Sequence, residues 1–206
     1  AEHRLLLARP VLLAGLLGGF MIPILLRGLG AQAYGLWIGA IAVGVMAQIF
    51  DIGLDFSVTR EVAADSGRER KGAAGFVRAA ANAELLFAAA GAALIAALGL
   101  PLSRGFHLSE EHQRIAPLIF ACAGIGYFAD RMMSLAAAVL TGLRRFDVVN
   151  KIGITGAVLR ALGLLAVLTA GGGLPQVAAW QAAITLAPAL AALWAMGRIA
   201  PRYRFR

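Results

Sequence analysis

Six long apolar stretches, separated by short polar segments, dominate the sequence. An α-helix rises about 1.5 Å per residue, so about 20 apolar residues are needed to cross a hydrocarbon core about 30 Å thick. Helices are predicted over residues 5–26, 34–56, 76–100, 115–140, 152–170 and 176–196. A helix of a soluble protein rarely stays apolar on every face for such a length. The pattern therefore predicts an all-α polytopic membrane protein, in which residues 1–206 form a single six-helix transmembrane bundle.

The second apolar stretch shows how one of these helices leaves the membrane. No charged residue occurs from Tyr34 to Phe50, and two carboxylates follow at Asp51 and Asp55. The segment after them carries the basic residues Arg60, Arg68, Arg70 and Lys71. Because Lys and Arg are enriched in cytoplasmic loops, this helix is predicted to run from the outer face to the inner face.

Basic residues are distributed unevenly between the two sides of the predicted bundle. Arg27, Arg104 and Arg114 fall on the outer side, and Arg131 and Arg160 fall within spans. The other 14 of the 19 Lys and Arg residues fall on the inner side. This asymmetry predicts that both termini lie in the cytoplasm. It also accounts for the net charge of +8, so nucleic acid is not expected as a partner.

The composition agrees with a membrane protein and offers no catalytic centre. The chain is 60% hydrophobic and 15% charged, with a mean hydropathy of +0.79, whereas soluble domains are about a quarter charged. One cysteine, Cys122, allows no intrachain disulfide, and His3, His107 and His112 lack the spacing of metal ligands. No nucleophile–base arrangement or nucleotide-binding loop is present, so we expect no enzyme activity, cofactor or metal.

The first apolar stretch has a second interpretation. Arg4 and Arg9 precede it and residues 31–33 (AQA) mimic a cleavage site, as in a secretory signal. The stretch is longer than a usual signal core, and Gly15 and Gly19 have the G-x-x-x-G spacing of helix packing. A transmembrane helix is therefore favoured.

Helix ends and turns are marked by a few residues. Pro101 is predicted to end the third helix, and Ser109 to cap the fourth. Three glycines, residues 171–173, precede Pro175. A phosphate-binding loop is the alternative there, but no strand or lysine frames the glycines, so a tight outer turn is predicted.

Ionisable residues inside the predicted spans are the candidates for function. They are Asp51, Asp55, Glu84, Asp130, Arg131 and Arg160. A charge near the centre of a span costs about 3 kcal/mol on insertion scales, so each should face protein or water and have a partner. The predicted helix ends place Asp130 and Arg160 at matching depth. Asp130, or a residue next to it, is therefore predicted to pair with Arg160.

Two roles are open for these charges. A clamp between helices is favoured for three residues at the predicted cytoplasmic edge, Asp51, Asp55 and Arg60. Arg131 and Arg160 could equally be clamps or ligands for a phosphate or pyrophosphate headgroup, whose oxygens match the guanidinium fork. Arg27 could receive the same headgroup on release, although extension to the outer interface is its more ordinary explanation.

Several short motifs carry a family resemblance. AYGLW at residues 33–37, D-x-G-L at 51–54, T-R at 59–60 and RRFDVVNKI at 144–152 resemble, in their order and spacing, the polysaccharide-unit flippases of the multidrug/oligosaccharidyl-lipid/polysaccharide exporter superfamily. The resemblance covers nearly the whole chain. It implies the N-terminal six-helix lobe of a two-lobe transporter, whose partner would be a C-terminal lobe. Such flippases move lipid-linked (polyprenyl-pyrophosphate) oligosaccharides across the bacterial cytoplasmic membrane by alternating access, for cell-surface polysaccharide synthesis.

Two other functions remain open at this point. A cation-coupled multidrug exporter of the same superfamily would use the intramembrane carboxylates as proton or sodium sites. The arginines among these charges favour an anionic lipid headgroup over that alternative. A non-transporting membrane scaffold for glycan assembly would instead have all its polar pairs closed and no cavity.

Overall fold

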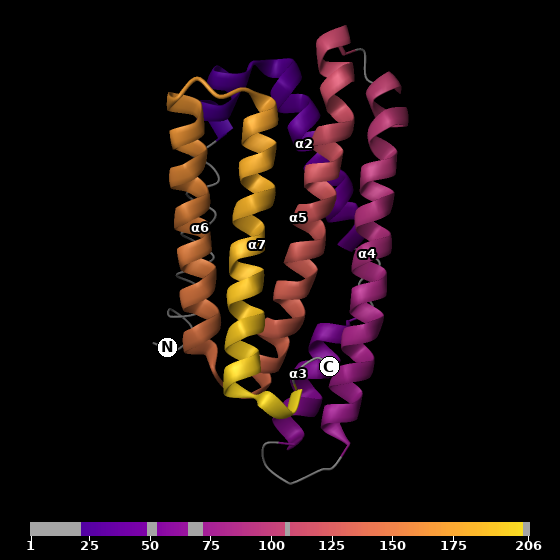
Figure 1. Ribbon diagram of the computed structural model, residues 1–206, viewed down its shortest axis with the longest axis vertical. Coiled ribbons are helices and arrows are strands. Elements are labelled where there is room, and N and C mark those ends of the chain that lie inside the picture. Colours follow the sequence, from indigo (N-terminus) through magenta and orange to yellow (C-terminus); the bar gives the residue numbers. More distant parts are fainter. Residues whose placement is uncertain (1–21, 49–52, 66–71, 106–107, 204–206) are drawn as a thin grey trace.

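The computed structural model describes residues 22–48, 53–65, 72–105 and 108–203, and in them the chain is all-α. Its helices run roughly parallel to one long axis (Figure 1). Residues 22–29 form a helical segment that precedes the first full helix. The elements that follow are α2 (Ala31–Ala47), α3 (Leu54–Asp65), α4 (Ala73–Gly105), α5 (Glu110–Gly142), α6 (Phe146–Thr169), α7 (Leu174–Ile199) and the 3-10 helix η2 (Pro201–Tyr203).

Four helices are long and apolar enough to cross a membrane. These segments are Ala73–Gly99, Glu110–Gly142, Phe146–Thr169 and Leu174–Ile199. They correspond to the last four predicted spans, and each helix extends beyond the predicted bounds at one or both ends. An all-α protein with membrane-spanning helices is therefore confirmed. The count of six is not, because most of the predicted helix at 5–26 lies outside the described residues.

The predicted helix over 34–56 is wrong in its C-terminal half. α2 ends at Ala47, and its 17 residues cover about 26 Å. A separate helix, α3, begins at Leu54, directly after Gly53. Gly53 has a φ of +67°, a left-handed conformation that glycine adopts without a steric penalty and that α-helices exclude. The apolar pattern continues through this break, so hydropathy alone cannot detect it.

One predicted helix end needs correction, and another is confirmed in its position but not in its hydrogen bond. Pro101 does not end its helix, because α4 continues through it to Gly105. Ser109 occupies the N-cap position of α5 but makes no capping bond to the backbone; its hydroxyl lies 2.6 Å from Nδ1 of His112 instead. The tight turn at residues 171–173 is confirmed: Gly171 has a φ of +75°, and the Gly172 amide donates to the Val167 carbonyl at 2.8 Å.

α5 is the central helix of the bundle. α4 packs along one side of it and α7 along another, while α6 lies at the edge beside α7 (Figure 1). Glycines permit the close contact of α4 with α5. A Cβ on Gly124 would lie 2.6 Å from the Ala92 carbonyl oxygen, and one on Gly99 would lie 2.8 Å from Cβ of Phe120. Small residues allow such backbone approach in membrane helices.

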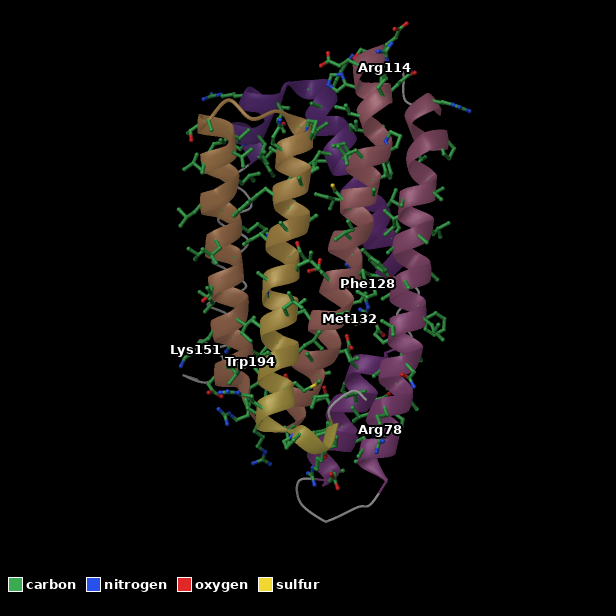
Figure 2. The ribbon with its side chains drawn as sticks, viewed as in Figure 1. Arg78, Arg114, Phe128, Met132, Lys151 and Trp194 are labelled. Carbon is green, nitrogen blue, oxygen red and sulfur yellow. The ribbon has the colours of Figure 1, made fainter. Side chains whose placement is uncertain are left out.

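The two ends of the bundle differ in charge. Arg78, Lys151 and Trp194 lie toward the end that carries α3 and η2, and Arg114 lies at the opposite end (Figure 2). The α5–α6 turn, with Arg144 and Arg145, lies between helix ends at the α3 end. Those basic residues of the predicted inner side that the structure describes thus lie toward one end of the bundle.

Candidate functional site

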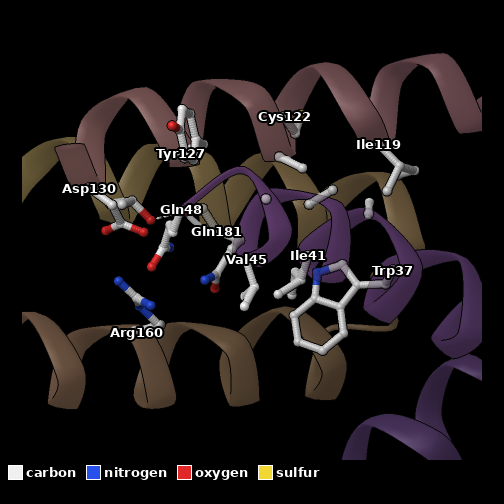
Figure 3. A pocket seen from close by; sticks show the side chains of 16 residues that line it. Trp37, Ile41, Val45, Gln48, Ile119, Cys122, Tyr127, Asp130, Arg160 and Gln181 are labelled. Carbon is white, nitrogen blue, oxygen red and sulfur yellow. Dashed lines mark hydrogen bonds between the residues drawn. The ribbon is translucent and has the colours of Figure 1, made fainter. Parts of the chain in front are cut away.

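A polar cavity lies among α2, α5, α6 and α7. Its volume is about 150 Å³. Its walls include Trp37 of α2, Gln48 directly after α2, Asp130 of α5, Arg160 of α6, and Gln181 and Thr185 of α7. Figure 3 shows Arg160 pointing from α6 toward Asp130, with the amide side chains of Gln48 and Gln181 beside it. We call this space the polar cavity.

Arg160 is held in place by the contact of α6 with α7. Gly163, one turn further along α6, leaves room for the Trp180 ring, since a Cβ there would lie 1.9 Å from that ring. The Trp180 indole N–H donates to the Arg160 carbonyl at 3.4 Å. Within the described part of the chain, Nε of Arg160 is buried and has no hydrogen-bond partner. A buried guanidinium N–H without an acceptor is costly, so this group is ready to bind one.

Asp130 faces the same cavity but does not close the predicted ion pair. It lies across the polar cavity from Arg160 (Figure 3). No carboxylate–guanidinium contact within 4.0 Å joins the two among the described residues. Asp130 is also exposed, in part to this cavity. The two charges therefore border a shared space instead of neutralising each other by direct contact.

A second, larger cavity adjoins the first. Its volume is about 580 Å³, and it lies between the helical segment at 22–29, α2 and α6. Aliphatic side chains and glycines form most of its walls, including Leu25, Ile38, Gly153 and Leu164. We call it the apolar cavity. It shares four lining residues with the polar cavity, namely Trp37, Ile41, Arg160 and Gln181.

Arg131 belongs to a different environment from Arg160. It is buried, and its Nε lies 2.5 Å from Oε1 of Glu84. Its Nη2 lies 3.6 Å from Oδ2 of Asp55, which also accepts a hydrogen bond from the Ser134 hydroxyl at 2.5 Å. These contacts join α3, α4 and α5. We call this group the Arg131 network, and its geometry is that of a clamp between helices.

The remaining sequence candidates lie away from both cavities. Arg60 is exposed on α3, and Arg27 is exposed in the helical segment at 22–29. Neither of these two described residues lines the polar or the apolar cavity. Asp51 lies outside the described residues. The structure thus brings together Asp130 with Arg160, and separately Asp55 with Glu84 and Arg131.

A second polar contact, absent from the sequence predictions, joins α3 to η2. The Tyr203 hydroxyl donates to Oδ2 of Asp65, and Nη2 of Arg202 lies 3.1 Å from the same oxygen. Asp65 and Tyr203 are buried. Burial, together with the hydrogen bond to Asp65, raises the pKa of Tyr203 to about 12. Only the fold brings these residues together, because 137 others separate Asp65 from Tyr203 along the chain.

The polar cavity also contains residues that the sequence analysis did not select. Gln181 and Thr185 both line it from α7. They stand four residues apart in a predicted span, a spacing that puts them on one helix face. That pattern is the signal that could have found them. Gln48 carried no such signal, because it lies just past α2, where the sequence predicted an unbroken helix.

The described chain is thus a helical membrane protein with a polar cavity and an adjoining apolar cavity between its helices. No protein-family model, curated protein or solved structure matches it.

Proposed function

We propose that the protein carries an anionic, lipid-linked saccharide across the bacterial cytoplasmic membrane, with this chain forming one six-helix lobe of the carrier. The observation that carries the proposal is Arg160: a guanidinium in a membrane-spanning helix, lining a cavity, with a buried Nε that has no hydrogen-bond partner among the described residues. A phosphate or pyrophosphate headgroup supplies the acceptors that this group lacks.

Energetics support a ligand role for Arg160. Placing an arginine within a span costs about 3 kcal/mol on insertion scales, and burying its donor without a partner adds about 1–3 kcal/mol. The Arg131 network offsets this cost with two carboxylates. Arg160 has no such contact in the described structure. A buried donor without a contacting acceptor, at the wall of a cavity, is typical of a binding residue.

A cation-coupled exporter is the second candidate, and Asp130 favours it. Its carboxylate lines the same cavity and is free of a direct ion pair within the described part of the chain. A proton or sodium ion could bind there. A scaffold is less well supported, because it would not require an open polar cavity between four helices.

The test compares translocation of a fluorescent polyprenyl-pyrophosphate disaccharide in membrane vesicles from cells that make the protein from its own gene. We expect Arg160→Gln to lower the rate at least tenfold, the equivalent of one lost charge-assisted contact of about 1.4 kcal/mol or more. The translocation rate of Arg160→Lys should lie between those of the wild type and Arg160→Gln, because lysine keeps the positive charge but lacks the forked guanidinium. Arg114→Gln, at an exposed position on the end of the bundle opposite α3, is the matched control.

The same vesicles separate the alternatives. Wild-type translocation with Arg160→Gln would contradict the proposal. Loss of drug export in Asp130→Asn, without loss of saccharide translocation in Arg160→Gln, would support the exporter instead. If vesicles with the wild-type protein transport neither probe faster than vesicles without it, the scaffold is supported.

A further inference from the structure

The polar and apolar cavities meet at one boundary, and the only positive charge on that boundary among the described residues is Arg160. Trp37, Ile41 and Gln181 are the other residues that line both spaces. On one side of this boundary lie Asp130 and the Gln48 amide, and on the other lie aliphatic side chains such as Leu25 and Ile38. A molecule that spanned the boundary would meet hydrogen-bonding groups at one end and hydrocarbon at the other.

We infer that the apolar cavity binds the hydrocarbon chain of the same molecule whose anionic headgroup binds Arg160. This inference rests on the proposed function and adds to it a site for the lipid part within this lobe. The ligand is then an amphiphile, with a phosphate or pyrophosphate group at its Arg160 end and an isoprenoid or acyl chain lying between the 22–29 segment, α2 and α6.

Charge and polarity at the boundary support this occupant over water or a free anion. An ordered water needs two to four polar partners, and a free anion needs donors or cations around it, neither of which a hydrocarbon wall supplies. The walls of the apolar cavity are mostly carbon, and three of its polar side chains, Trp37, Arg160 and Gln181, lie at the boundary. Trp37 and Tyr34 also line it, and aromatic rings with a polar edge suit the junction between a polar and an apolar region.

Small residues on one face of α6 create the room for a chain. Gly153, Gly156, Ala157 and Ala161 all line the apolar cavity. Their spacing of three or four residues places them on a single helix face. A Cβ on Gly153 would meet no atom within 4 Å. A larger side chain at Gly153 would therefore enter free space without moving the backbone.

The test measures binding to the full chain in lipid nanodiscs by titration calorimetry. The probes are farnesyl pyrophosphate, inorganic pyrophosphate and farnesol. Gly153→Leu reduces the room in the apolar cavity, and Ala157→Leu is a second variant on the same wall. Gly75→Leu, exposed on α4 with no atom within 4 Å of a Cβ, is the matched control. It makes the same glycine-to-leucine change in a helix, away from both cavities.

We expect Gly153→Leu to weaken the binding of farnesyl pyrophosphate at least tenfold more than the binding of inorganic pyrophosphate. Each methylene kept out of an apolar site should weaken binding about fourfold, so excluding two suffices. Arg160→Gln should weaken both pyrophosphate probes and leave farnesol little changed. Gly75→Leu should bind all three probes as the wild type does. Circular dichroism confirms that each variant is folded.

Two results would overturn the inference in different ways. If Gly153→Leu and Ala157→Leu weaken the two pyrophosphate probes equally, the chain does not lie in the apolar cavity, while a loss in Arg160→Gln would still support the proposed function. If Arg160→Gln binds both pyrophosphate probes as tightly as the wild type, the anion site itself is wrong, and the proposed function fails together with the inference.

Discussion

Asp130 and Arg131 are neighbours in the sequence but lie in different environments. Successive residues of an α-helix are about 100° apart around its axis. Asp130 therefore faces the polar cavity between α5 and α6, while Arg131 turns toward α4 and α3. The sequence identified both as charges in the membrane. It could not assign their partners, because hydropathy gives the depth of a residue in a span and not the rotation of the helix.

The Arg131 network should contribute strongly to stability. Removing one partner of a buried ion pair leaves the other charge uncompensated and costs about 3–5 kcal/mol. We expect Arg131→Gln and Glu84→Gln each to lower the free energy of unfolding by that order, and the double variant to lose less than the sum. Denaturant unfolding in detergent measures this, with the exposed Arg78→Gln as control. Strictly additive losses would show that the pair is not coupled.

Tyr203 should make the protein less stable at alkaline pH. Its pKa is raised to about 12 in the folded chain, whereas an unfolded tyrosine titrates near pH 10. Between these values the folded state binds more protons than the unfolded state, so the free energy of unfolding falls as pH rises. Between pH 10 and pH 12 we expect the free energy of unfolding of the wild type to fall by about 2 kcal/mol through this group. Tyr203→Phe should lack this fall.

Ultraviolet titration gives an independent check on Tyr203. Tyrosinate absorbs at longer wavelength than tyrosine, so the wild type should show a late ionisation step that Tyr203→Phe lacks. A titration that is unchanged by this substitution would mean that the hydroxyl is not held by burial and Asp65.

The helices could be predicted wherever the sequence contains an apolar segment long enough to cross a membrane. α4 to α7 each contain a long apolar segment, and their predicted ranges lie within the observed helices apart from one residue at the end of α6. The helices extend further because backbone hydrogen bonding continues past the apolar segment, even through Pro101. The break between α2 and α3 could not be predicted from hydropathy. Glycine is common in membrane helices, so Gly53 gave no sign of its left-handed backbone.

At the scale of the whole molecule, the uneven distribution of basic residues predicts which end faces the cytoplasm. Single cysteines test this in a Cys122→Ala background. Gly72 is exposed at the α3 end and Ser109 at the opposite end. We expect a membrane-impermeant maleimide to label Ser109→Cys in intact cells, and to label Gly72→Cys only after the membrane is opened. The reverse pattern would invert the proposed orientation.

The adjacency of Asp130 and Arg131 on α5 has a mechanical consequence. Both side chains are fixed to one rigid helix, so α5 cannot turn about its own axis without moving both. A turn that brought Asp130 toward Arg160 would draw Arg131 away from Glu84 on α4. A rotation of α5 would therefore change the surroundings of Asp130 in the polar cavity and the contacts of Arg131 with α3 and α4 at the same time.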